Sequence, residues 1–192
     1  MLFRSMRQAL KEMNETSALL AADPIGIRIG INTGEVILCD IGAAEARVDL
    51  TIIGDSVNVA SRFESAAKQY GIDNLISEAT LAPFYSRYAS RIIDRVRVKG
   101  KLEALSCYEL FNFADHITTT EKELIEIFDA GFLAYTEGRF EKALKLFKES
   151  DRLEAVQLEG ANNPSRLYMR RCHKLTLEPP ENWDGVWHLT DK

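Results

Sequence analysis

The sequence predicts an α+β protein: an antiparallel sheet with helices on one face, followed by a C-terminal helical hairpin extension. Short apolar alternations with the period of a strand recur up to about residue 114, and runs with helical period lie between them. From 120 to 177 no strand pattern occurs. We therefore expect an α+β part over 1–114 and a helical extension with its tail over 115–192.

In the α+β part, apolar residues on one stripe predict an amphipathic helix over 3–20. A longer helix is predicted to begin with Asp55 or Ser56 as its N-cap and to end at Gly71. The remaining predicted elements are strands over 25–31, 35–42, 46–53, 74–78, 91–100 and 105–111, and a short helix near 78–86.

Three helices are predicted in the extension, roughly over 120–136, 139–154 and 164–176. Small and aromatic residues there follow the spacing of a tetratricopeptide-type helix hairpin: Gly131, Ala134, Gly138, Phe140, Ala143 and Phe147. About one and a half repeats fit, too few for a free-standing solenoid, so the extension is expected to be an appendage that must dock on something. Trp183 and Trp187 are interpreted as docking anchors rather than a ligand cage.

Composition excludes several classes of protein. Hydrophobic residues make up 46% of the 192 residues and charged residues 28%, which is typical of globular proteins and not of disordered or collagen-like chains. A net charge of −5 argues against a main role in binding nucleic acid or an anionic membrane surface. Cys39, Cys107 and Cys172 form no CxxC pair and are expected to be reduced, as in the cytoplasm. No run of eighteen apolar residues occurs, so no membrane segment is expected.

The segment TIIGDSVNVASRFES, residues 51–65, carries the candidate chemistry. Asn58 and Arg62 are four residues apart on a predicted helix and therefore share one face. An amide and a guanidinium there can hold a phosphoryl group and stabilise charge that develops on it, and Lys99 in RVKGK offers a second cation. Spacing alone leaves open that Asn58 is a local cap and Arg62 a solvated helix residue. Rossmann and P-loop glycine patterns are absent from the sequence.

Three blocks, GIRIGINTGEVILCDIG, TIIGDSVNVASRFES and VRVKGK, resemble in order and separation the catalytic domain of class III adenylate and guanylate cyclases over residues 3–111. The resemblance implies a partial ferredoxin-like cyclase fold that makes cyclic AMP and pyrophosphate from ATP in intracellular signal transduction. It implies that Thr51 contacts the adenine edge, Asn58 orients the ribose, Arg62 stabilises the transition state and Lys99 binds the terminal phosphates. The tail WDGVW also looks like the extension behind some bacterial cyclases.

The same resemblance implies two Mg²⁺ or Mn²⁺ ions held by two aspartates, and neither aspartate motif is found. FDAGF at 128–132 is similar only superficially, because it lies in the helical extension. We expect the metal aspartates and the adenine-reading lysine upstream of Met1, so the chain is predicted to be the C-terminal portion of a catalytic domain and inactive alone. The family forms homodimers with composite active sites, of which this chain would supply one half-site. Missing strands are expected to leave the strand over 25–31 with an unpaired edge and a bared apolar face.

Two functions remain open. The chain is either part of a cytoplasmic adenylate cyclase, which upstream segments could tether to the membrane, or a non-catalytic cyclase-like remnant that acts as a protein-interaction or regulatory module. The helical extension is a candidate site for a protein partner in both cases. Retention of Thr51, Asn58, Arg62 and Lys99 favours the enzyme, because a remnant has no chemical need for all four.

Overall fold

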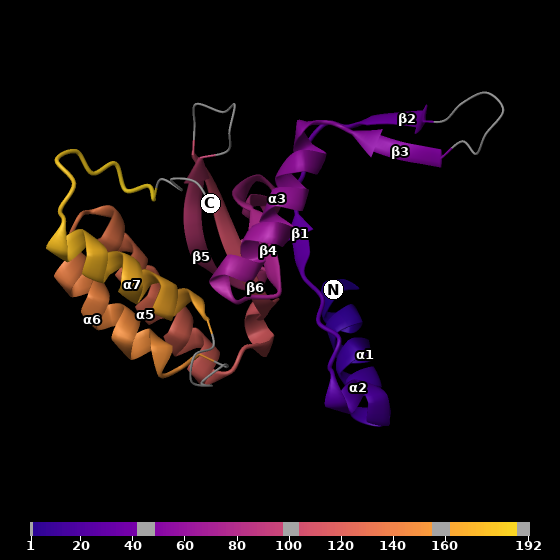
Figure 1. Cartoon of the computed structure of the whole chain (residues 1–192), viewed down its shortest axis with the longest axis horizontal. Helices are drawn as coiled ribbons and strands as arrows, with labels where there is room; N and C mark the ends of the chain where they lie inside the picture. Colours follow the sequence, from indigo (N-terminus) through magenta and orange to yellow (C-terminus); the bar gives the residue numbers. More distant parts are fainter. Residues whose placement is uncertain (1, 42–48, 98–103, 155–161, 188–192) are drawn as a thin grey trace.

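The computed structural model describes residues 2–41, 49–97, 104–154 and 162–187 and confirms an α+β architecture followed by helices (Figure 1). In chain order, its elements are α1 (Leu2–Thr16), α2 (Ala18–Ala22), β1 (Ile29–Ile31), β2 (Ile37–Ile41), β3 (Asp49–Ile53), α3 (Asp55–Tyr70), β4 (Asn74–Ser77), α4 (Glu78–Leu81), η1 (Ala82–Phe84), β5 (Tyr88–Arg97), β6 (Ala104–Phe113), η2 (Ala114–His116), α5 (Thr119–Thr136), α6 (Phe140–Asp151) and α7 (Pro164–Leu177). Within these ranges no helix combines the length and apolarity needed to cross a bilayer.

Four strands form the main sheet in the order β1-β4-β6-β5. The pairs β4–β6 and β5–β6 are antiparallel, as predicted, whereas β1 and β4 run parallel. Parallel pairing follows from the long connection between these two strands, which contains α3 and returns the chain to the same end of the sheet. The strands β2 and β3 form a separate antiparallel ribbon that projects away from the sheet (Figure 1).

Two predicted helix boundaries are wrong. The helix expected over 3–20 is interrupted at Ser17, whose hydroxyl accepts a hydrogen bond from the Leu20 N–H and caps α2. The N-cap of α3 is Gly54, with no side-chain cap bond, rather than Asp55 or Ser56. The predicted end is confirmed, because Gly71 takes the left-handed conformation that closes α3.

One hydrophobic core joins α3, the sheet and the helical extension. Phe63 of α3, Ile93 of β5, Phe128 of α5 and Tyr168 of α7 all belong to it, and each is at most 2% exposed. The three predicted helices of the extension are confirmed, and they pack together beside β5 (Figure 1). The extension is therefore docked on the sheet through a shared core.

Within the extension, the small residues allow the close helix approach that their spacing predicts. A Cβ at Gly131 would lie 3.1 Å from the ring of Phe147 on α6. Trp183 donates from Nε1 to the carbonyl oxygen of Tyr135 at 2.9 Å and meets its ring edge-on, whereas Trp187 lies against the Arg171 guanidinium. The prediction that both tryptophans are docking anchors is confirmed. Classification of the extension as tetratricopeptide-like stays a prediction.

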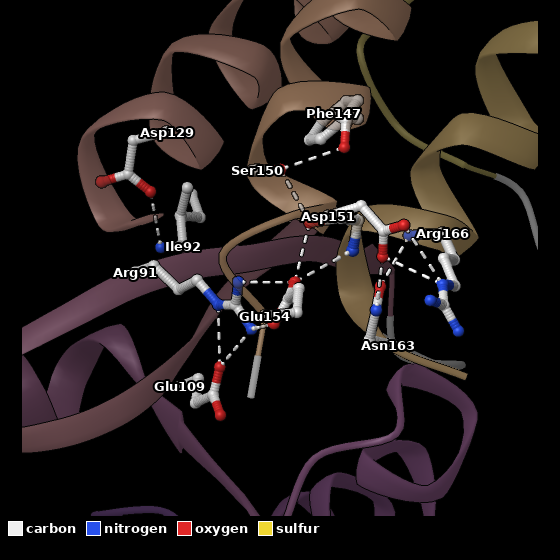
Figure 2. A network of polar contacts seen from close by, with 11 residues as sticks. Arg91, Ile92, Glu109, Asp129, Phe147, Ser150, Asp151, Glu154, Asn163 and Arg166 are labelled. Carbon is white, nitrogen blue, oxygen red and sulfur yellow. Dashed lines mark hydrogen bonds and ion pairs between the residues drawn. The ribbon is translucent and has the colours of Figure 1, made fainter. Parts of the chain in front are cut away.

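Buried charges reinforce this docking. The guanidinium of Arg91 on β5 donates to both carboxylate oxygens of Glu154, at 2.9 and 3.0 Å, and to Glu109 at 2.8 Å (Figure 2). Burial opposes the charge on Arg91, but the two carboxylates outweigh it and raise the pKa of the guanidinium. Glu154 follows α6, so this ion pair ties the end of that helix directly to the sheet.

Candidate functional site

The site begins at the turn from β3 into α3, where Gly54 has φ 153° and ψ 163°. Residues with a side chain rarely adopt this backbone conformation, and a Cβ here would lie 3.2 Å from the carbonyl oxygen of Glu35. The glycine of the GDS motif is therefore a backbone requirement. It allows α3 to start directly after the ribbon.

Asn58 and Arg62 lie on the exposed face of α3, in its first two turns. Their neighbours Val59 and Phe63 point into the core and are 1% and 2% exposed, which fixes the rotation of the helix about its axis. Within the described ranges, neither the Asn58 side chain nor the Arg62 guanidinium has a hydrogen-bond or ion-pair partner. The Asn58 side chain is not the helix cap, because the N-cap position belongs to Gly54.

Thr51 and Lys99 come from other elements. Thr51 is half-buried on β3, opposite Cys39 of β2, and the ribbon that carries it leads straight into α3. Lys99 lies outside the described residues, in the connection between Arg97 at the end of β5 and Ala104 at the start of β6. The structure thus brings Asn58 and Arg62 together on one helix face, with Thr51 on the adjoining ribbon.

Sequence reasoning missed the residues that hold α3 in place. A Cβ at Gly30 would overlap the carbonyl oxygen of Ala60, and a Cβ at Gly34 would overlap the hydroxyl of Ser56. Asn32, between the two glycines, donates from its side-chain amide to the carbonyl oxygen of Ser56 at 3.1 Å. The sequence does contain a signal for this contact. Gly30 and Gly34 are four residues apart, and they face Ala60 and Ser56, two small residues of α3 that are also four apart.

The residues that the structure describes do not fit a divalent metal site. Across the described part of the chain, no three His, Cys, Asp or Glu side chains are grouped closely enough to hold an ion. Asp129 of the FDAGF segment accepts a hydrogen bond from the Ile92 N–H at 3.2 Å (Figure 2). Burial raises its pKa to about 6. This aspartate has a structural contact with β5, as its place in the helical extension predicted.

Comparison with known proteins identifies the family. The adenylate and guanylate cyclase catalytic domain matches residues 2–112, more than half of the chain. The chain therefore belongs to this family, as the sequence blocks predicted.

Relatives of both nucleotide specificities are similar to it. An adenylate cyclase of Anabaena cylindrica is 40% identical over 112 residues, which are 55% of this chain and 22% of that protein. Retinal guanylyl cyclase 2 of Rattus norvegicus is 38% identical over 79 residues, 41% of this chain and 7% of that protein. The chain thus spans less than a quarter of either relative. The crystal structure of the adenylyl cyclase CyaB from P. aeruginosa is 31% identical, with a TM-score of 0.44 over 57% of this chain and 56% of that chain.

Proposed function

We propose that this chain supplies the nucleotide-binding half-site of an adenylate cyclase that acts in intracellular signal transduction. One observation carries the proposal: Arg62 is an exposed cation, without a carboxylate partner among the described residues, one turn from Asn58 on a helix held at backbone contact with β1. A guanidinium without a carboxylate partner is available to an anionic ligand. Because α3 is held against β1, the helix that carries this guanidinium is fixed in position. Membership of the cyclase family supports a nucleoside triphosphate as that ligand.

The proposed chemistry closes a ring on the ribose. The 3′-hydroxyl of ATP loses its proton to solvent and its oxygen attacks the α-phosphorus. The bond from that phosphorus to the bridging oxygen of the β-phosphate breaks, and pyrophosphate leaves with the electron pair. Asn58 orients the ribose, and Arg62 stabilises the negative charge that grows on the α-phosphoryl group. Lys99 binds the terminal phosphates, and Thr51 contacts the edge of the adenine.

The isolated chain is expected to be inactive. Family members use Mg²⁺ or Mn²⁺, but the described residues do not fit such a site, so no step is assigned to a metal here. Carboxylates from outside the described residues would have to bind the ions. The chain would then contribute only the half-site formed by Thr51, Asn58, Arg62 and Lys99.

We propose further that this half-site is completed in a homodimer. The β2–β3 ribbon exposes aliphatic side chains on both faces, each 46–67% accessible: Ile37, Leu38, Leu50, Ile52 and Ile53. A two-stranded ribbon is only marginally stable in water on its own, and exposed aliphatic surface favours association. The ribbon is continuous in sequence with α3, which supports a composite site that includes Asn58 and Arg62.

A second apolar surface lies beside β1. Strand β1 ends the described sheet with one edge unpaired, and a hollow of about 580 Å³ lies next to it. Its lining is mainly aliphatic and includes Ile29, Ile31, Ile76, Leu81 and Leu110. The unpaired edge of β1 and the apolar hollow beside it support association.

A complementation assay tests the proposal. The chain is mixed with a longer cyclase in which the residue equivalent to Arg62 is alanine, and cyclic AMP formation from ATP with Mn²⁺ is measured. We expect partial recovery of activity with the unaltered chain and none with Arg62→Ala. The control Lys68→Ala removes a positive charge from the other end of the same helix and should complement as well as the unaltered chain. No recovery with any variant would refute the proposal.

The alternative function is a non-catalytic remnant that binds a protein partner through the helical extension, which is firmly docked and has grooves of its own. Thermal unfolding with and without ATP and Mn²⁺ separates the two functions. A half-site predicts a higher melting temperature with ATP, lost in Arg62→Ala, whereas a remnant predicts no change. In both cases we place the protein in the cytoplasm.

A further inference from the structure

A groove between α6 and α7 lies on the surface of the helical extension. Its volume is about 480 Å³, its apolar lining comes from Leu144 and Met169, and its basic lining includes Lys148, Arg170 and His173. We propose that this groove binds an acidic amphipathic peptide segment of a partner protein. The proposal is independent of cyclase activity, because it concerns the helical extension alone.

Charge in the groove is uncompensated. Lys148 is exposed and has no ion-pair partner in the described part of the chain. Arg170 donates to the side-chain oxygen of Asn162 at 2.7 Å, but this partner is a neutral amide and leaves the guanidinium charge in place. These side chains can therefore form ion pairs with carboxylates of a ligand at little cost in existing contacts.

The acidic side chain of the groove is already engaged. Asp151 accepts hydrogen bonds from Arg166 at 2.9 Å and from Asn163 at 2.7 Å (Figure 2). Because this carboxylate is held at the start of α7, its charge is balanced locally by Arg166 and does not cancel that of Lys148 or Arg170.

The basic character is local to this pair of helices. Together α6 and α7 contain seven Lys and Arg against three Asp and Glu, although the whole chain has a net charge of −5. Of the seven, Arg166 and Arg171 are already paired with Asp151 and with Asp94 of β5. An acidic segment is attracted here and repelled by the remainder of the protein, which directs it to the groove.

The apolar lining decides the kind of acidic ligand. Leu144 and Met169 are only partly buried and pack against the hydrophobic core, so the base of the groove is fixed in position. A nucleic acid backbone or inorganic phosphate has no apolar group to place there. A peptide with leucine-like side chains at helical spacing and carboxylates between them satisfies both parts of the groove.

Fluorescence anisotropy with the full chain tests this inference. The probe is a fluorescein-labelled 14-residue peptide with leucine at every third or fourth position and glutamate elsewhere; a second peptide has glutamine in place of glutamate. We expect the glutamate peptide to bind at least tenfold more tightly than the glutamine peptide. The variant Lys148→Glu/Arg170→Glu should weaken binding of the glutamate peptide at least tenfold.

The control variant Lys142→Glu/Lys145→Glu makes the same change in net charge on α6 outside the groove and should change the affinity less than threefold. A second variant, Met169→Gln, should weaken binding about fivefold without altering any charge. Circular dichroism and thermal unfolding confirm that each variant is folded. Equal losses in the two double variants, equal affinity for the two peptides, no peptide binding, or tighter binding of a dodecathymidine oligonucleotide would overturn the proposal.

Discussion

Arg171 of α7 donates a hydrogen bond to the carboxylate of Asp94 on β5 at 2.7 Å, and the two side chains are 8% and 2% exposed. The same carboxylate accepts the hydroxyl of Tyr70, the last residue of α3, at 2.6 Å, and the N–H of Arg95 at 2.7 Å. Burial opposes the charge on Arg171, but nearby groups that include Asp94 outweigh it and raise the pKa of the guanidinium. One buried carboxylate therefore joins the helical extension, the sheet and the helix that carries Asn58.

Replacement of Arg171 should destabilise the whole protein. In Arg171→Met the Asp94 carboxylate remains buried without its cation, and we expect the free energy of unfolding in urea to fall by about 3–5 kcal/mol. The neighbouring exposed Arg170→Met should cost less than about 1 kcal/mol. A similar small cost for both variants would show that the buried pair contributes little.

Gly30 should be intolerant of a side chain. In Gly30→Ala the new methyl group meets the backbone of α3 at Ala60, so α3 must move, at an expected cost of about 1–3 kcal/mol in the free energy of unfolding. Gly26→Ala is a matched control four residues earlier, where an added Cβ meets nothing within 4 Å. If the two variants are equally stable, α3 is not held by this close approach.

Asp129 should make stability depend on pH. Its folded-state pKa of about 6 lies above the ordinary value of 3.8, so the native state binds the proton more tightly than the unfolded state. Its contribution to stability is full below pH 4 and is lost as the pH rises through 6. Asp129→Asn should therefore gain stability relative to the unaltered protein between pH 4 and 7, by up to about 3 kcal/mol. Glu123→Gln, an exposed change on the same helix, should show no such gain. If the difference in the free energy of unfolding between Asp129→Asn and the unaltered protein does not change with pH, the prediction is wrong.

Thr51 should influence base preference in an intact, dimeric cyclase. Thr51→Val keeps the shape of the side chain and removes the hydroxyl, which should lower the ratio of kcat/KM for ATP over GTP about tenfold, the worth of one hydrogen bond. The melting temperature should stay within a few degrees, because Thr51 has no side-chain hydrogen bond in the described structure. An unchanged ratio would remove Thr51 from base recognition.

Self-association should depend on the β2–β3 ribbon. Leu38 and Leu50 are 63% and 67% exposed, and Leu38→Glu/Leu50→Glu should shift the chain towards monomer in sedimentation velocity, because burying two carboxylates in an interface is unfavourable. The control variant Leu19→Glu/Leu177→Glu changes two leucines elsewhere that are 79% and 69% exposed and should leave association unaltered. A monodisperse monomer of the unaltered chain at high concentration would contradict the expectation.

Most elements could be predicted from local patterns. Helical and strand periods identified α3 and the helices of the extension within a few residues, and Gly71 marked the end of α3 correctly. The break at Ser17 was missed, because the apolar stripe continues through it while a local hydroxyl caps the next helix. The N-cap of α3 was misassigned because the backbone conformation of Gly54 cannot be read from residue type.

The residues of the candidate site could be predicted from a sequence motif, whereas the contacts that hold α3 in place were not predicted. Asn58 and Arg62 could be placed on one helix face because four residues make about one turn. Their exposure, and the lack of any partner within the described residues, depend on how Val59 and Phe63 pack into the core.

The sequence by itself determined the α+β class, the cyclase family and the identity of Thr51, Asn58, Arg62 and Lys99 as candidate site residues, since periodicity and short motifs are local properties. Tertiary structure alone decided that Gly30 and Gly34 hold α3 at backbone contact, that Asp94 and Arg171 meet across 77 residues, and that α6 and α7 form a basic groove. These contacts join segments far apart in the chain. From the sequence, a charged residue such as Arg91 is expected on the surface, because burying a charge removes it from water at a high cost in free energy. Only the folded structure shows the partner that compensates this cost.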